Sequence, residues 1–140
     1  MTIPEKEKQI IEEFGIFDDW MDKYNYLIEL GQSLPIIEDK YRNDSHLING
    51  CQSRVWISAE MEDGKMILKA DSDAVITKGI VYLLIRVLSG EKPEKILNNN
   101  LDFLKHIGLQ EHLSPTRANG LTSMIKQIKL YALAFQAKGG

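Results

Sequence analysis

The sequence predicts an α+β protein in which a small antiparallel sheet packs against helices. Three features of the chain lead to this prediction. An Asp63-Gly64 pair separates two runs of alternating apolar and polar residues, the region from about Ala74 to Ser89 is apolar on nearly every side of a helix, and both ends of the chain show helical spacing of apolar residues. With 140 residues, 44% of them hydrophobic, the chain is expected to form a single domain over residues 1–140 with a sizeable core.

Two helices are predicted at the start of the chain. Pro4 suits the first turn of one helix, which Gly15 ends, and Asp18 or Asp19 caps the other, which ends near Gly31. Apolar residues recur at helical spacing in both, namely Ile10, Ile11 and Phe14 in the first and Trp20, Tyr24, Leu27 and Ile28 in the second. We expect both stripes to face the core, although the aromatic one could also form a binding face.

The region between the second helix and the sheet is charged and irregular. Its charged side chains are expected to lie in solvent: Asp39, Lys40, Arg42 and Asp44. A short strand over residues 46–48 is expected to lead into the loop that precedes the hairpin.

The Asp63-Gly64 pair is a two-residue turn of the kind that hairpins prefer. The register that this turn implies pairs Glu62 with Lys65, Met61 with Met66, Ala59 with Leu68 and Ile57 with Ala70. These apolar partners and Val55 then share one face, whereas Ser58, Glu60 and Lys69 share the other. The turn and the alternation therefore predict the same hairpin.

Helices are predicted to fill the rest of the chain. The starts and stops expected from the sequence are Ser72-Asp73 and Gly90 for the long central helix, Pro93 for a short one, Asn100 and Gly108 for another, and Ser114-Pro115 for the last. The last helix carries an apolar stripe of Leu121, Met124, Ile125, Ile128, Ala132 and Phe135. A helix as apolar as the central one is expected to be buried.

Composition excludes several classes of protein. The net charge is −3, and no basic run or arginine–aromatic pattern indicates a nucleic-acid partner. The longest apolar run, Ile80 to Ile85, is too short to span a bilayer, and the first residues lack the apolar core of a signal peptide. We therefore expect no membrane association. A single cysteine allows no disulfide within the chain, so we expect a reducing cytoplasm.

That single cysteine, Cys51, follows Gly50 directly and precedes the first strand of the hairpin. Glycine permits a tight turn, and Asn49 and Ser53 can satisfy it with side-chain hydrogen bonds. The pattern indicates a thiol on a loop at the mouth of a strand, and such a thiol is a candidate reactive group. The alternative is a small buried hydrophobe, which is the commonest role of a free cysteine.

Nucleotide and metal motifs are absent from the sequence. It contains neither a phosphate-binding Gly-x-x-x-x-Gly-Lys-Ser/Thr loop nor a Gly-x-Gly-x-x-Gly segment. His106 and His112 are six residues apart, which is wrong for two ligands on one helical face, so we expect no metal site. His46 could approach Cys51 as a base, but surface or capping roles are the simpler interpretation of all three histidines.

The segment Gly50-Cys51-Gln52-Ser53-Arg54-Val55-Trp56 resembles the signature of the SufE family of sulfur-acceptor proteins, which includes CsdE. Ser72-Asp73-Ala74 with Lys78-Gly79 is similar to the family's Ser-Asp-Ala-x-x-x-Lys-Gly segment, and Pro115-Thr116-Arg117 with Gly120 to its Pro-Ser-Arg-x-x-Gly segment. The resemblance runs in order along nearly the whole chain. Two departures are Thr116, where serine is usual, and Arg54, where a neutral amide is common.

This resemblance implies a fold like that of SufE and of the IscU scaffold, together with a persulfide shuttle. A pyridoxal-phosphate cysteine desulfurase of the SufS or CsdA type would form a persulfide on its own thiol. Cys51 would take the outer sulfur as a thiolate and deliver it to the SufBCD scaffold for iron–sulfur cluster assembly. Stimulation of the desulfurase is also implied. The pyridoxal phosphate belongs to the partner, so no bound cofactor is expected, and the protein would be a monomer or weak homodimer.

Several other residues are candidates for the site. If the last helix points its start at the Cys51 loop, Arg117 and the free amides there could stabilise a thiolate or persulfide anion. A structural salt bridge from Arg117 to Asp71 or Asp73 is the alternative. Gly50, Gln52, Ser53, Ser72 and Asp73 are interpreted as residues that shape the loop or contact a partner, with helix capping the stronger expectation for Asp73.

Other functional classes remain open at this stage. An iron–sulfur scaffold would need several ligands, and one cysteine cannot supply them within a protomer. A cysteine hydrolase would need a histidine paired with Cys51, which a distance between them would test. An adaptor would activate a desulfurase without accepting sulfur, and it would keep its effect after Cys51→Ser.

Overall fold

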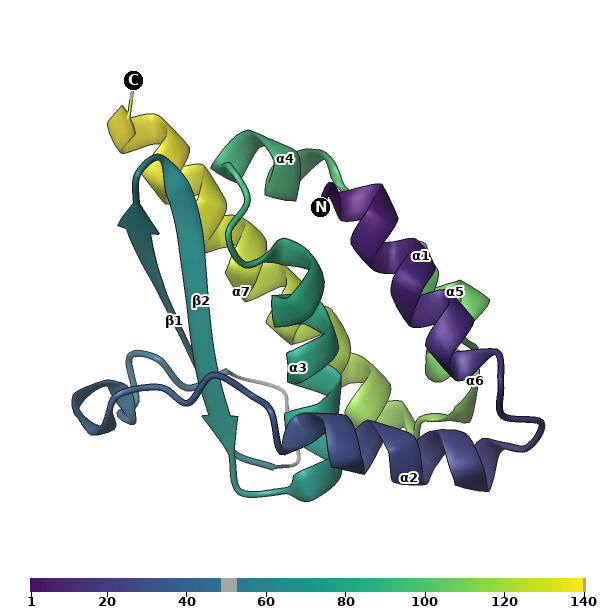
Figure 1. Ribbon diagram of the computed structural model, residues 1–140. Helices are drawn as coiled ribbons and strands as arrows, with labels where there is room; N and C mark the ends of the chain where they lie inside the picture. Colours follow the sequence, from purple (N-terminus) through teal and green to yellow (C-terminus); the bar gives the residue numbers. More distant parts are fainter. Residues whose placement is uncertain (49–52, 140) are drawn as a thin grey trace.

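The protein is described by a computed structural model that defines residues 1–48 and 53–139. Its elements are α1 (Ile3–Phe14), α2 (Trp20–Gly31), the short 3₁₀ helix η1 (Asp39–Tyr41), β1 (Val55–Glu62), β2 (Lys65–Ser72), α3 (Val75–Leu88), α4 (Pro93–Asn98), α5 (Phe103–His106), α6 (Leu109–His112) and α7 (Pro115–Gly139). The hairpin lies on one side of the molecule, α1 with α5 and α6 on the other, and α3 and α7 between them (Figure 1). The α+β prediction is confirmed.

The hairpin has the register that the sequence predicts. Glu62 pairs with Lys65, Met61 with Met66, Ala59 with Leu68 and Ile57 with Ala70. Asp63 and Gly64 both have positive φ, 51° and 79°, which is the backbone that a tight hairpin turn requires and that aspartate and glycine tolerate best. Ser58, which was expected on the outer face, is nonetheless buried, with 6% of its surface exposed.

Short segments extend both edges of the hairpin. Beside β2, the Ala70 amide donates to Pro35 O and the Ile37 amide donates to Ala70 O, both at 3.0 Å. Beside β1, the expected strand over residues 46–48 is reduced to a single bridge between Leu47 and Trp56. The segment that precedes the cysteine loop is therefore tied to the sheet at its last described residues.

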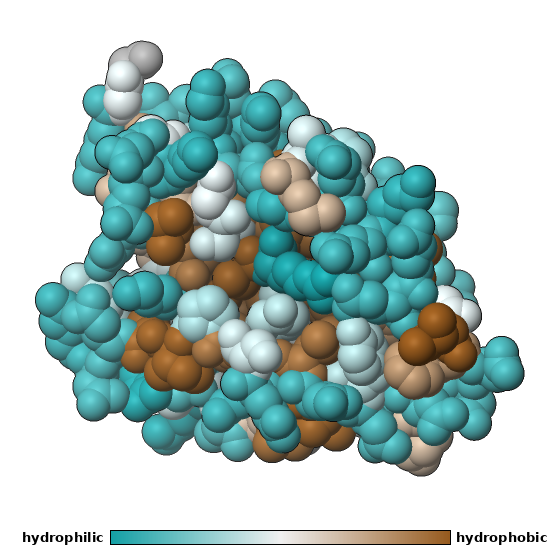
Figure 2. Space-filling model, viewed as in Figure 1, coloured by the Kyte–Doolittle hydropathy of each residue, from teal (hydrophilic) through white to brown (hydrophobic). Residues whose placement is uncertain are grey.

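α3 is the central helix of the core, as its nearly uniform apolar character predicts. Its buried residues include Ile80, Val81, Leu83, Leu84 and Val87. The long helix α7 also faces the core, where it buries Leu121, Met124, Ile128 and Ala132. Both stripes predicted for the helices α1 and α2 contribute to the core as well, through Ile10, Phe14 and Leu27. Figure 2 shows a mostly hydrophilic face on which hydrophobic side chains emerge in separate areas.

Helix starts were predicted well where a capping side chain precedes a proline or an acidic turn. Asp19 caps α2 by accepting a hydrogen bond from the Asp22 amide at 2.9 Å. Ser114 accepts from the Arg117 amide at 3.3 Å at the start of α7. α4 begins at Pro93, as predicted.

No helix among the described residues is long and apolar enough to cross a membrane.

Two capping predictions were wrong. Ser72-Asp73 does not cap α3, since the N-cap position is Ala74 and no side chain caps it. Asn100 does not cap α5, whose N-cap is Asp102. The physical reason in the first case is that both side chains bind the backbone of Arg54, just before β1, and Ser72 Oγ also accepts from the amide of Ala74, which is the N-cap residue and not the N2 or N3 amide that a helix cap binds.

Arg42 is exposed, as predicted for the charged residues of the irregular segment, but it also makes a long-range contact. Its guanidinium donates to Asp39 at 2.7 Å and to Asp71 of β2, so that it joins the irregular segment to the sheet. The sequence could not reveal this contact because Arg42 and Asp71 are 29 residues apart.

Candidate functional site

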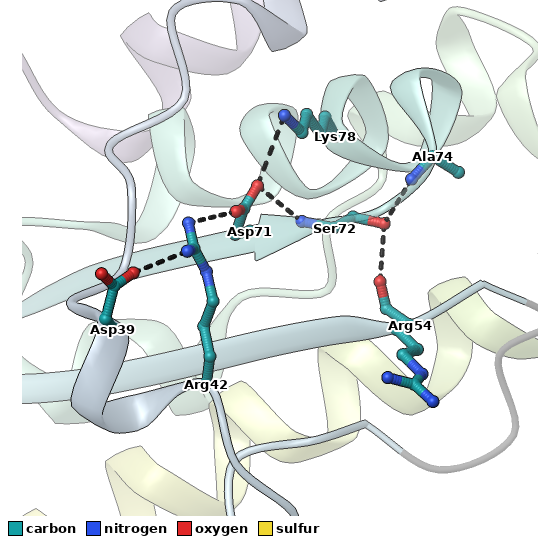
Figure 3. A network of polar contacts seen from close by, with 7 residues as sticks. All are labelled: Asp39, Arg42, Arg54, Asp71, Ser72, Ala74 and Lys78. Atoms are coloured by element: carbon teal, nitrogen blue, oxygen red, sulfur yellow. Dashed lines mark hydrogen bonds and ion pairs between the residues drawn. The ribbon is translucent and has the colours of Figure 1, made fainter.

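The end of the hairpin opposite the Asp63-Gly64 turn, which is its lower end in Figure 1, is held by hydrogen bonds around Arg54 (Figure 3). Ser72 Oγ donates to Arg54 O at 2.7 Å and accepts from the Ala74 amide at 3.2 Å. Asp73 Oδ1 accepts from the Arg54 amide at 3.0 Å, and the Asp73 amide donates to Arg54 O at 3.2 Å. The backbone that follows the loop therefore has a fixed position, although the Arg54 side chain is exposed.

Asp71 supports this arrangement from the neighbouring position on β2. Its carboxylate pairs with Arg42 and with Lys78 Nζ, the latter at 3.4 Å, and its Oδ1 accepts from the Ser72 amide at 2.8 Å. Figure 3 shows Arg42 and Lys78 converging on Asp71, while the Arg54 side chain points away from this network. Asp71 thus pairs with two cations near the end of β2.

Arg117 does not form the salt bridge to Asp71 or Asp73 that was considered as its structural role, as judged from the ion pairs of residues 1–48 and 53–139. Its Nη1 instead donates to the hydroxyl of Tyr24 on α2, a residue 93 positions earlier in the chain. Arg117 as a whole residue is half-buried. Arg117 therefore forms no ion pair with a carboxylate among the described residues.

A small pocket lies where α3 and the start of α7 meet the segment that follows the cysteine loop. It is lined by Ser53, Thr77, Ile80, Thr116, Arg117, Gly120 and Met124. Its volume of about 10 Å³ accommodates roughly one water-sized group and is too small for an organic cofactor. Ser53 is two residues beyond Cys51, so the pocket adjoins the cysteine loop in the chain.

The electrostatics of the pocket favour negative charge. α7 begins at Pro115, which has no amide hydrogen, and the Arg117 amide donates to Ser114, so Thr116 carries the first amide at a helix start where the backbone dipole is positive. Arg117 adds a full positive charge with a fork of N–H donors that suits an anion. The arrangement could therefore stabilise a thiolate or another small anion.

Three predicted site residues, Gly50, Cys51 and Gln52, lie outside the described residues, as does Asn49. Of the others, Ser53 and Arg117 line one pocket, whereas Ser72 and Asp73 hold the Arg54 backbone beside it. The candidate site residues that are described therefore gather at the lower end of the hairpin. Tyr24 and Trp20 also contact this region, and the sequence predicted them in an aromatic stripe that faces the core, with a binding face as the alternative.

Two of the three histidines have side-chain contacts with nearby residues. His46 Nδ1 is 2.9 Å from Asn43 Oδ1, and the His112 ring stacks on Trp20 with 4.2 Å between ring centroids. His106 is exposed. Within the part of the chain that the structure describes, no group of three or more His, Cys, Asp or Glu residues could hold a metal ion.

Fold and site together define a class of protein: a small α+β domain whose only cysteine precedes the hairpin in the sequence, and in which Ser53, two residues later, shares a pocket with an arginine at a helix start. Comparison with known families identifies it further. The family model of SufE, described as an Fe–S metabolism associated domain, matches residues 8–132. The chain belongs to the SufE family, and this membership supports a role in Fe–S metabolism.

Individual relatives agree with this assignment. A SufE-like protein of Rhizobium meliloti (strain 1021) is 40% identical over 126 residues, which covers 86% of this chain and 90% of the relative. A SufE-like protein of Synechocystis is 37% identical and covers 96% of this chain and 85% of its own length. SufE-like protein 1, chloroplastic/mitochondrial, of Arabidopsis thaliana is 36% identical over 98% of this chain, which matches 37% of that longer protein.

The fold also has a counterpart among solved structures. The solution structure of a hypothetical protein from Thermus thermophilus superposes with a TM-score of 0.77 at 26% identity, covering 96% of this chain and 97% of the other. The likeness thus extends over the whole domain, helices and hairpin together.

Proposed function

We propose that this protein is a sulfur carrier that accepts persulfide sulfur from a cysteine desulfurase onto Cys51 and delivers it for iron–sulfur cluster assembly. The observation that carries the proposal is that Arg117, at the cationic start of α7, lines the same pocket as Ser53, two residues after the only cysteine of the chain. Family membership supplies the context of Fe–S metabolism.

The transfer step is an exchange between a thiolate and a persulfide. The Cys51 thiolate attacks the outer sulfur of the partner's persulfide, a new S–S bond forms to Cys51, and the partner's S–S bond breaks. The partner's cysteine leaves as a thiolate. The proton on the transferred sulfur stays on that sulfur and moves with it to Cys51. Charge and electrons balance, and no oxidant or reductant enters the step.

The chain's own residues suit this chemistry. Positive charge at Arg117 and the dipole at the start of α7 favour the Cys51 thiolate that must attack, and also the persulfide anion that forms when the product loses its proton. Ser72 and Asp73 hold the Arg54 backbone, so the loop begins its return to the sheet at a fixed point. Since the sequence contains no second cysteine, sulfur loaded on Cys51 must leave to another molecule instead of forming an internal disulfide.

The partners in this proposal are a desulfurase of the SufS or CsdA type, which holds the pyridoxal phosphate, and the SufBCD scaffold as the recipient. The cytoplasm, as a reducing compartment, is the proposed location. Draining the desulfurase's persulfide would also explain a stimulation of its turnover.

Intact mass spectrometry tests the proposal directly. The protein is incubated with a cysteine desulfurase, pyridoxal phosphate and free cysteine, and its mass is measured before and after a thiol reductant. A gain of one or more sulfur atoms that the reductant removes, and that Cys51→Ser lacks, is the expected result. No gain with either type of desulfurase would overturn the carrier function.

A further inference from the structure

Aromatic residues of α2 contact the end of α6 and the start of α7. The Trp20 ring stacks on His112, just before α7, with an interplanar angle of 17°. One turn further along α2, the Tyr24 hydroxyl accepts a hydrogen bond from Arg117 Nη1. Tyr24 and Trp20 themselves meet edge to face at 6.1 Å between ring centroids. These contacts join α2 to the helix start that carries Arg117.

α2 is well fixed, so a residue on it can hold another in place. Asp19 caps its first turn, and at its last residue a Cβ on Gly31 would lie 2.8 Å from the Gly79 nitrogen, which shows how closely α2 and α3 approach. Thr77, two residues before Gly79 on α3, lines the small pocket. The same helix pair therefore positions both Tyr24 and one wall of the pocket.

An arginine side chain has many rotamers, and fixing it costs conformational entropy. The Tyr24 hydroxyl is the hydrogen-bond partner of the Arg117 guanidinium within the described part of the chain. A phenol on a packed ring is a rigid acceptor, because few torsions separate its oxygen from the helix. Tyr24 therefore reduces the freedom of a charge that would otherwise sample solvent.

We propose that Tyr24 is a positioning residue for sulfur transfer, whose hydroxyl holds the Arg117 guanidinium at the pocket lined by Ser53 and Thr77. The role deepens the carrier function and rests on it, since Arg117 must act on the sulfur anion for its position to matter. Tyr24 contributes orientation to this step and takes no part in the bond exchange itself.

Tyr24→Phe tests this role because it removes only the hydroxyl. The measurement is the rate of Cys51 alkylation by iodoacetamide as a function of pH, together with the rate of sulfur transfer from a loaded desulfurase. We expect the midpoint of the alkylation profile to rise by about half a pH unit. Transfer at neutral pH should fall about threefold. Arg117→Gln should produce larger changes of the same sign.

A double mutant separates positioning from a general loss of structure. If Tyr24 acts through Arg117, Tyr24→Phe should have almost no further effect on the profile in an Arg117→Gln background. Tyr131→Phe is the matched control, because its hydroxyl donates to Ile57 O at 2.9 Å on the sheet and is not part of the pocket. That variant should keep the wild-type pH profile, and circular dichroism should show that all variants remain folded.

The outcomes are distinguishable. A normal profile for Tyr24→Phe, with an altered one for Arg117→Gln, would overturn the role of Tyr24 and leave the carrier function intact. Additive effects in the double mutant would also overturn the role of Tyr24 and leave the carrier function intact. A normal profile for Arg117→Gln would remove the group that Tyr24 is proposed to position, and would overturn the inference as well. Failure of the wild-type protein to gain sulfur by mass would instead refute the carrier function itself.

Discussion

Gly79 of α3 faces Leu27 of α2 so closely that a Cβ on Gly79 would lie 2.2 Å from the Leu27 carbonyl oxygen. No real contact is that short, so a side chain at this position must push the two helices apart. The sequence resemblance had marked Gly79 only as part of a Lys-Gly segment. The structure gives a steric reason for the glycine: α2, which carries Tyr24, can approach α3 because Gly79 has no side chain.

Gly79→Ala should therefore lower the free energy of unfolding. The new Cβ would clash with backbone atoms of Leu27, which cannot rotate out of the way as a side chain can. We expect a loss of about 2 to 3 kcal/mol, measured by urea denaturation. Gly139→Ala is the control, because nothing lies within 4 Å of a Cβ placed there. Equal stability of the two variants would show that α2 and α3 do not pack this closely in solution.

Local patterns explain which parts of the fold the sequence could predict. The hairpin register followed from Asp63-Gly64 because turn type and alternation are properties of neighbouring residues. The start of α7 followed from Ser114-Pro115 for the same reason. These elements depend on backbone preferences that a short segment carries by itself.

Contacts between distant segments could not be predicted in this way. Ser72 and Asp73 resemble a helix cap, yet they bind Arg54, because the hairpin places that backbone opposite them. Tyr24 likewise was predicted as part of an apolar stripe, and only the tertiary fold brings its hydroxyl to Arg117 at the start of α7. The candidate residues were thus identifiable from the family signature, but their physical roles were not.

Asp73→Ala should loosen the hairpin where the cysteine loop returns to it. The Arg54 amide loses its acceptor, and we expect faster hydrogen exchange at this amide and a stability loss of about 1 kcal/mol. Asp73→Asn is the matched control, since it retains an acceptor oxygen and removes the charge. If Asn and Ala accelerate exchange equally, the carboxylate charge and not the hydrogen bond fixes this backbone.

The ion pair of Glu13 and Arg86 should make stability depend on pH in the acidic range. Hydrogen bonding from Arg86, opposed by burial and reinforced by Tyr26, lowers the pKa of Glu13 from its ordinary value of 4.5. A carboxylate with a lowered folded-state pKa stabilises the fold above its ordinary pKa, and this stabilisation is lost as pH falls through the folded-state value.

Glu13→Gln should consequently cost about 1 kcal/mol near neutral pH, because solvent partly screens the pair, and the difference from wild type should shrink below pH of about 4. Urea denaturation at several pH values measures this. Glu12→Gln makes the same change of charge at an exposed neighbour and should have little effect at any pH. A Glu13 variant whose deficit stays constant down to the lowest pH would rule out the ionic contribution.

Cys51→Ser distinguishes the carrier from an adaptor that activates a desulfurase by contact alone. The substitution replaces one sulfur by oxygen, so binding through the rest of the surface should persist while the nucleophile is lost. If stimulation of cysteine turnover arises from draining the partner's persulfide, the variant should bind the desulfurase with affinity near that of the wild type but give no stimulation. Binding is measured by titration calorimetry and turnover by alanine release from cysteine. Full stimulation by Cys51→Ser would instead mean that contact with the partner accelerates its chemistry, since no sulfur could then be passing through position 51.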